Sequence, residues 1–111
     1  MSDREPSRYR LEVSESADAE ADAVYLWMSQ NLGPIKAERW YRGLWEACEN
    51  LLLFPRMGQS VPGQDETARL LLYDRYRVLY RIVESEGLIR VLRIVHAGRS
   101  APDAASTDEG T

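Results

Sequence analysis

The sequence has very little cysteine and histidine, and each shortage excludes a class of protein. One cysteine in 111 residues cannot form an internal disulfide, so a disulfide-held scaffold is excluded and a reducing cytoplasm is expected. One histidine and one cysteine cannot supply a typical zinc site, and neither a metal nor another cofactor is expected. Cys48 lies in an apolar helical pattern, which predicts a small buried hydrophobic residue.

Long apolar runs, phosphate-binding glycine motifs and an export signal are also missing. No apolar segment approaches the roughly 18 to 20 residues of a membrane span, and MSDREPSRYR has no apolar stretch typical of a signal peptide. No Ser-His-Asp arrangement is legible, and Gly63 or Gly87 alone does not make a phosphate-binding loop. We therefore expect a cytoplasmic protein with no membrane partner.

Charge is present in both signs but is unevenly distributed. The net charge is −4, yet residues 69–99 hold seven arginines against three acids, whereas residues 1–68 hold seven Lys or Arg against twelve Asp or Glu. The guanidinium of arginine suits phosphate and carboxylate, so this basic segment indicates a local anionic partner. Charges that only protect solvated strand edges are the alternative interpretation.

Hydrophobic periodicity predicts a single α+β domain over residues 1–100. Helices are expected near 16–31 and 34–54, with Ser14 or Ser16 as the first N-cap and Gly33-Pro34 between the two. Strands are expected near 8–13, 68–73, 75–83 and 88–95, and residues 55–67 are expected to form a loop. Residues 101–111 are small, polar and acidic, which predicts a disordered tail.

Short connections predict an antiparallel helix hairpin packed on one face of an antiparallel sheet, in β-α-α-β-β-β order. The opposite sheet face is then free to present arginine. Alternation places Arg77 and Arg81 on one face of their strand and leaves Tyr76, Val78 and Tyr80 for the core. If Arg69 converges with them, the three form a cationic patch suited to phosphate. Arg90 and Arg93 fall on opposite faces of the last strand by simple alternation.

His96 follows the last strand, and Arg99 lies three residues further on. As the only histidine, His96 is the natural candidate for a general acid or base, whereas a structural role is the alternative for a histidine at a strand end.

The order of these elements, together with YRVLYRIVESEGLIRVLRIVHAGRS, resembles the RelE/ParE superfamily of bacterial toxins. The resemblance covers about residues 9 to 100 and includes FPRMG, Arg69-Leu70-Leu71 and the ending Ile94-Val95-His96-x-x-Arg99. It implies a growth-inhibitory toxin of a type II toxin–antitoxin system, neutralised by a cognate antitoxin. RelE-like members cut mRNA on the ribosome, and ParE-like members inhibit DNA gyrase.

The resemblance implies that Arg69, Arg77 and Arg99 match basic positions of the nuclease members. However, Leu71 replaces a second expected cation, and the C-terminal tyrosine of RelE-like enzymes is missing. These departures favour a ParE-like toxin that binds DNA gyrase. A ribosome-dependent mRNA endoribonuclease and a degenerate member that binds only an antitoxin are the alternatives.

Overall fold

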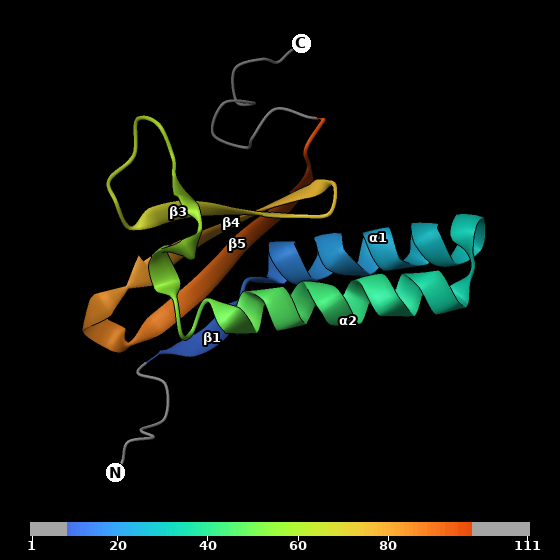
Figure 1. The fold of residues 1–111 in the computed structure, drawn as a ribbon, viewed down its shortest axis with the longest axis horizontal. Helices are drawn as coiled ribbons and strands as arrows, with labels where there is room; N and C mark the ends of the chain where they lie inside the picture. The colour runs from blue at the N-terminus through green and yellow to red at the C-terminus, as the bar shows by residue number, and fades with distance from the viewer. Residues whose placement is uncertain (1–8, 99–111) are drawn as a thin grey trace.

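The computed structural model describes residues 9–98, which form two layers, a helical hairpin and a five-stranded sheet (Figure 1). The helices are α1 (Glu15–Leu32) and α2 (Pro34–Asn50). The strands are β1 (Arg10–Val13), β2 (Gln59–Ser60), β3 (Ala68–Tyr73), β4 (Tyr76–Val83) and β5 (Leu88–His96). The predicted fold class is confirmed, and the tail at residues 101–111 lies outside the described residues.

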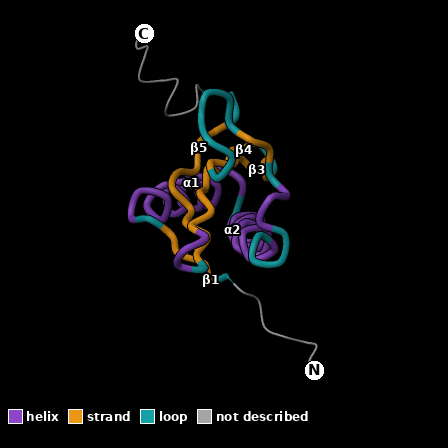
Figure 2. Tube along the Cα trace, turned by 90° about the vertical axis from the view of Figure 1, so that its left-hand side faces the viewer, coloured by secondary structure: helices purple, strands orange, loops and turns teal. Residues whose placement is uncertain are grey.

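The sheet is mixed, not antiparallel throughout as predicted, and its strand order is β1-β5-β4-β3-β2. Strands β3, β4 and β5 form the expected antiparallel meander, and β2 adds a short antiparallel edge within the stretch predicted as a loop. β1 pairs in parallel with β5, because the helical hairpin carries the chain back before the meander begins. Figure 2 looks nearly along the helices, so that both are seen end-on.

Local signals set the helix ends. The side chain of Ser14 accepts a hydrogen bond from the Ala17 N–H at 3.0 Å, and Gly33, at φ 100°, separates α1 from α2. The second helix ends at Asn50 rather than at the predicted residue 54. The N–H groups of Leu51 and Leu52 bond three residues back, which tightens the chain into a turn before Pro55.

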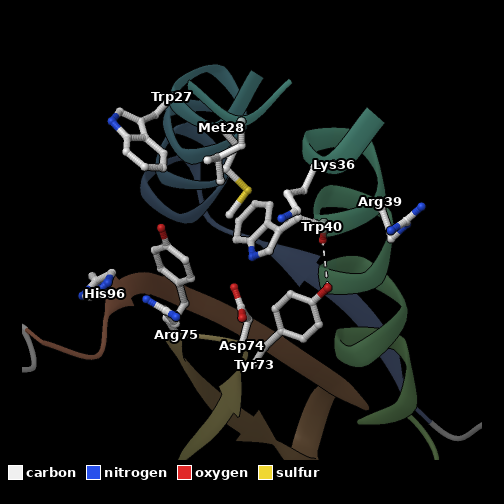
Figure 3. A pocket seen from close by; sticks show the side chains of 11 residues that line it. Trp27, Met28, Lys36, Arg39, Trp40, Tyr73, Asp74, Arg75 and His96 are labelled. Atoms are coloured by element: carbon white, nitrogen blue, oxygen red, sulfur yellow. Dashed lines mark hydrogen bonds between the residues drawn. The ribbon is translucent and has the colours of Figure 1, made fainter. Parts of the chain in front are cut away.

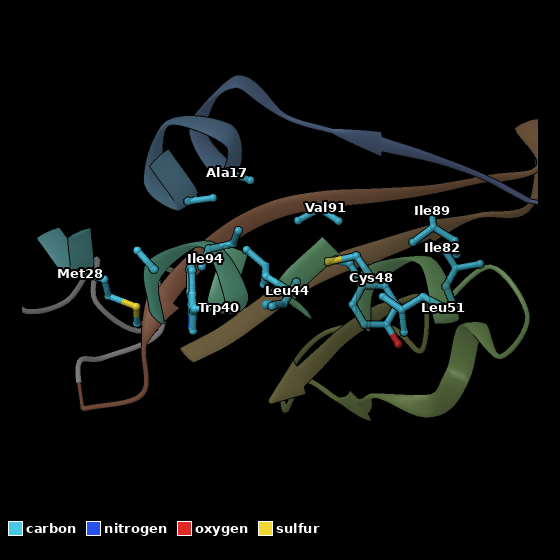
Figure 4. Packing of buried hydrophobic residues seen from close by; sticks show 14 residues of the cluster. Ala17, Met28, Trp40, Leu44, Cys48, Leu51, Ile82, Ile89, Val91 and Ile94 are labelled. Atoms are coloured by element: carbon cyan, nitrogen blue, oxygen red, sulfur yellow. The ribbon is translucent and has the colours of Figure 1, made fainter. Parts of the chain in front are cut away.

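The buried face of α2 is centred on Trp40. Trp40 is only 6% exposed and packs in the core with Leu44 and Cys48 (Figure 4). Tyr41 and Trp45 of the same helix are half-buried, and the centroid of the Tyr41 ring lies 5.3 Å from that of Tyr25 on the neighbouring helix. The apolar stripe of α2 is thus divided between the sheet and α1.

Cys48 is buried, as predicted, and burial, aided by the charge of Glu49, raises the pKa of its thiol to about 12. A thiol held in its protonated form is a poor nucleophile, so Cys48 serves as core packing.

A β-bulge in β5 changes the faces of its arginines. The register pairs Arg81 with Arg90 and Leu79 with Arg93, which leaves Leu92 as the extra residue between them. Side chains that face each other across a ladder share a sheet face, so Arg90 and Arg93 lie on the same face. The prediction that they lie on opposite faces was wrong because simple alternation does not include the bulge.

Candidate functional site

Arg77 and Arg81 lie on the sheet face turned away from the helices, hereafter the outer face. Their strand neighbours Val78 and Tyr80 are buried against the helical layer, and alternation therefore places the two arginines on the other side. Arg81 donates a hydrogen bond to the Thr67 hydroxyl at 2.8 Å and pairs with Asp65 at 3.4 Å. The charge of Arg81 on the outer face is thus partly neutralised by Asp65 of the loop that precedes β3.

Arg69 does not join them. Its cross-strand partner is Tyr80, whereas Arg77 is opposite Leu72 and Arg81 is opposite Ala68, so Arg69 lies on the helix-facing side. Its guanidinium donates hydrogen bonds to the main-chain carbonyls of Gly58, Glu66 and Arg56 at 2.8 to 3.2 Å. The expected convergence of three arginines is therefore wrong, and Arg69 instead holds the loop between α2 and β3.

His96 also lies on the helix-facing side, opposite Tyr76, and the two ring centroids are 5.2 Å apart. Its Nδ1 atom accepts a hydrogen bond from the Gly98 N–H at 3.0 Å. This bond leaves Nε2 to carry the proton of a neutral ring. Arg99, the other predicted residue of this segment, lies outside the described residues.

A groove of about 900 Å³, hereafter the hairpin groove, opens between the helices and the turn that joins β3 to β4 (Figure 3). Trp27 and Leu32 of α1 contribute apolar surface to it, and their side chains are 55% and 50% exposed. His96 closes the groove at the end of β5.

Trp40 forms the inner wall of the hairpin groove and is held there by contacts from two strands. Its carbonyl accepts a hydrogen bond from the Tyr73 hydroxyl at 3.0 Å, and its ring meets that of Tyr76 edge to face at 5.3 Å. Its indole Nε1 is buried and has no hydrogen-bond partner among the described residues. A buried N–H without a partner is unfavourable by about 1–3 kcal/mol, so an acceptor supplied from outside would relieve that penalty.

Cations predominate at the rim of the hairpin groove. Lys36, Arg39 and Arg75 line it, and Asp74 is the only carboxylate among its lining residues. None of the three cations forms an ion pair within residues 9–98, whereas five other arginines do: Arg42, Arg56, Arg81, Arg90 and Arg93. The groove therefore combines apolar walls with a net positive charge, a combination suited to an amphipathic, acidic partner segment.

Of the residues that line the hairpin groove, the sequence singled out His96 and Tyr76, whereas Trp40, Asp74 and Arg75 were not predicted as site residues. Trp40 lies three residues after Ala37 and four before Leu44, so the helical period alone could have placed it on the buried face. Asp74 and Arg75 could be recognised only as a turn, because their approach to α2 depends on the packing of the two layers.

Two further properties concern the described residues alone. Residues 9–98 contain no group of three or more His, Cys, Asp or Glu side chains that could hold a metal ion. Neither α1 nor α2 is long and apolar enough to cross a membrane.

Comparison with known proteins gives one family. The model of the "ParE toxin of type II toxin-antitoxin system, parDE" family matches residues 11–101. No curated protein sequence matches the chain.

Solved structures have the same fold. A structure of the chromosomal ParDE toxin–antitoxin system from P. aeruginosa has a TM-score of 0.68 at 22% identity, covering 82% of this chain and 98% of that one. The RelBE2 toxin–antitoxin complex from Mycobacterium tuberculosis gives 0.60 at 20% identity, covering 79% and 96%. The intact E. coli RelBE complex gives 0.56 at 20% identity, covering 82% and 99%. At these identities the likeness is one of fold.

Proposed function

This chain belongs to the ParE toxin family of type II toxin–antitoxin systems, and we propose that it inhibits DNA gyrase by binding and is neutralised by a cognate antitoxin in the cytoplasm. The proposal of an antitoxin is supported by the similar solved structures, which include the RelBE complexes of M. tuberculosis and E. coli. The hairpin groove, with apolar walls and a cationic rim, is a suitable surface for such a partner.

One observation favours binding over RNA cleavage. Arg77 faces Val95 on the outer face, whereas His96 faces Tyr76 on the opposite side of the sheet. Cleavage of RNA by attack of a 2′-hydroxyl needs a cation for the phosphorane and a proton-transfer group at the same phosphate. Arg77 and His96 do not meet at one phosphate in this arrangement. Arg69 lies on the same side as His96, but its guanidinium is already bonded to the main-chain carbonyls of Gly58, Glu66 and Arg56.

The two activities are separated by two assays on the same preparation. We expect the purified chain to inhibit supercoiling by DNA gyrase, to leave ribosome-bound mRNA intact, and to lose its inhibition when the product of the adjacent small open reading frame is added. His96→Gln should leave supercoiling inhibition unchanged, because binding does not require proton transfer.

Cleavage of mRNA by the wild type, lost by about 10² to 10⁴-fold in His96→Gln, would instead make the chain a RelE-like nuclease. A chain inactive in both assays that still binds the adjacent product would be a degenerate member.

A further inference from the structure

We infer that the hairpin groove is a receptor for a carboxylate side chain of the antitoxin, which accepts a hydrogen bond from Trp40 Nε1 between the charges of Lys36 and Arg75. The inference rests on the proposed function for the existence of the partner. It goes further by naming the chemistry that the partner presents and the residue of this chain that opposes it, Asp74.

Trp40 Nε1 is the hydrogen-bond donor of this site. Trp40 is 6% exposed, and its Nε1 lacks a partner within residues 9–98 although it lies in the wall of a large groove. Figure 3 shows this nitrogen on the side of the ring that faces the β3–β4 turn. Buried polar groups are nearly always hydrogen-bonded in stable assemblies. The ligand therefore presents an acceptor at this depth, and its apolar flank covers Trp27 and Leu32.

Charge decides between a neutral and an anionic acceptor. Lys36 reaches the groove from α2 and Arg75 from the turn between β3 and β4, while Arg39 extends away from it (Figure 3). Neither Lys36 nor Arg75 has a carboxylate partner among the described residues. Hydrogen bonds to a charged acceptor are about twice as strong as neutral ones, and the two cations favour such an acceptor over a carbonyl.

The charge of Asp74 weakens the binding of a carboxylate at this site. Its carboxylate lies between Trp40 and Arg75 in Figure 3, and its backbone adopts φ 55°, a conformation that few residues other than glycine, asparagine and aspartate accept. An incoming carboxylate meets the like charge of Asp74, so removing that charge should tighten binding. Asparagine keeps the backbone conformation and the side-chain shape, and Asp74→Asn therefore changes little besides charge.

The test titrates the 15N-labelled full chain with the product of the adjacent small open reading frame. The chain has three tryptophans, and their indole N–H signals are assigned with Trp27→Phe and Trp45→Phe. The Trp40 signal should move downfield on binding, while that of Trp45, which lies outside the groove, should stay in place. Replacing the partner's acids one at a time with their amides should identify one substitution that abolishes the Trp40 shift.

Calorimetry supplies the second readout. Lys36→Glu with Arg75→Glu should weaken binding by about 100-fold, or tenfold for each reversed charge. The matched control Arg42→Glu, on α2 but outside the groove, should change it by less than about threefold. Asp74→Asn should tighten it by up to about tenfold. Unchanged thermal midpoints confirm that each variant is folded.

An unmoved Trp40 signal, or equal losses in the groove variant and the control, would overturn the inference. It would also fail if Asp74→Asn shifted the Trp40 signal in the free chain without tightening binding, because Asp74 would then be the acceptor itself. These results leave supercoiling inhibition untouched, so they are distinguishable from failure of the proposed target. A partner that does not bind the wild type would overturn both.

Discussion

At the scale of single residues, Arg69 and Tyr80 hold the loop between α2 and β3. Arg69 is committed to main-chain carbonyls, and beside it the hydroxyl of Tyr80 donates to the Pro55 carbonyl at 2.6 Å and accepts from the Gly58 N–H at 3.0 Å. Burial, the largest cause, raises the pKa of Tyr80, so the hydroxyl stays protonated and able to donate. The side chains of Arg69 and Tyr80 thus supply hydrogen bonds to main-chain groups of this loop, which pairing with a neighbouring strand would otherwise provide.

Arg69→Ala should therefore lower the free energy of unfolding, because Arg69 has a structural role. The substitution leaves carbonyls of Arg56 and Gly58 without their donors, and we expect the free energy of unfolding to fall by about 1–3 kcal/mol in urea denaturation. Arg42→Ala removes only an exposed pair with Glu38 and should cost less than about 0.5 kcal/mol. Equal effects of the two substitutions would show that Arg69 is not a structural residue.

At the scale of elements, close approach of α2 to β3 depends on a glycine inside the helix. A Cβ atom at Gly43 would lie 2.2 Å from the hydroxyl of Tyr73, which bonds to the Trp40 carbonyl of the same helix. The contact holds the wall of the hairpin groove against the strand. The positioning of Trp40 thus rests on a residue with poor helix propensity.

Gly43→Ala should destabilise the protein, although replacing a helical glycine by alanine usually stabilises it. In an open helix alanine is favoured over glycine by about 1 kcal/mol, but here the clash with Tyr73 should destabilise the protein by about 1–3 kcal/mol. In a Tyr73→Phe background the nearest remaining ring atom is 3.3 Å away, and the cost should largely disappear. Thermal denaturation of the four proteins measures this coupling, and additive effects would contradict it.

The loop before β3 should be sensitive to acid. Hydrogen bonds from the Thr67 side chain and N–H lower the pKa of Asp65, helped by Arg81. Because the folded pKa lies below the unfolded value, this stabilisation is complete above about pH 4 and is lost as the pH falls through the folded pKa.

The difference in unfolding free energy between the wild type and Asp65→Asn should therefore be largest at neutral pH and should shrink toward pH 3. Urea denaturation across that range measures it, and a constant difference would contradict the assignment.

At the scale of the whole molecule, one carboxylate joins the two layers where the sheet has an open edge. β1 pairs with β5 only as far as Val91, and beyond it Glu20 of α1 accepts hydrogen bonds from the Ile94 N–H and the Arg93 side chain, both at 2.7 Å. The edge beyond β1 is thereby covered by a helix rather than left open to another strand.

Glu20→Ala and Glu20→Gln should separate the two contributions of this contact. Alanine leaves the Ile94 N–H without an acceptor, and we expect a loss of about 1–3 kcal/mol. Glutamine keeps an acceptor oxygen and should cost less. Hydrogen exchange of the Ile94 amide provides the site-specific readout, with Glu38→Ala as the exposed control. Exchange unchanged in Glu20→Ala would exclude the capping role.

Much of the fold was determined by sequence neighbours. The Ser14 cap, the Gly33-Pro34 break and the apolar stripes act over three or four residues, so the chain alone was sufficient to predict two helices and the meander. The family could also be recognised from short motifs in their order. The burial of Cys48 followed from the same helical stripe.

Only the tertiary structure decided which side chains meet. A shift of one residue in strand pairing moves every side chain to the other face, and nothing local specifies the pairing of Arg69 with Tyr80 or the bulge at Leu92. The hairpin groove depends likewise on contacts between residues more than thirty positions apart, such as the Tyr73 hydroxyl with the Trp40 carbonyl. Composition and periodicity carry no information on such distant pairs, because the packing of the layers creates them.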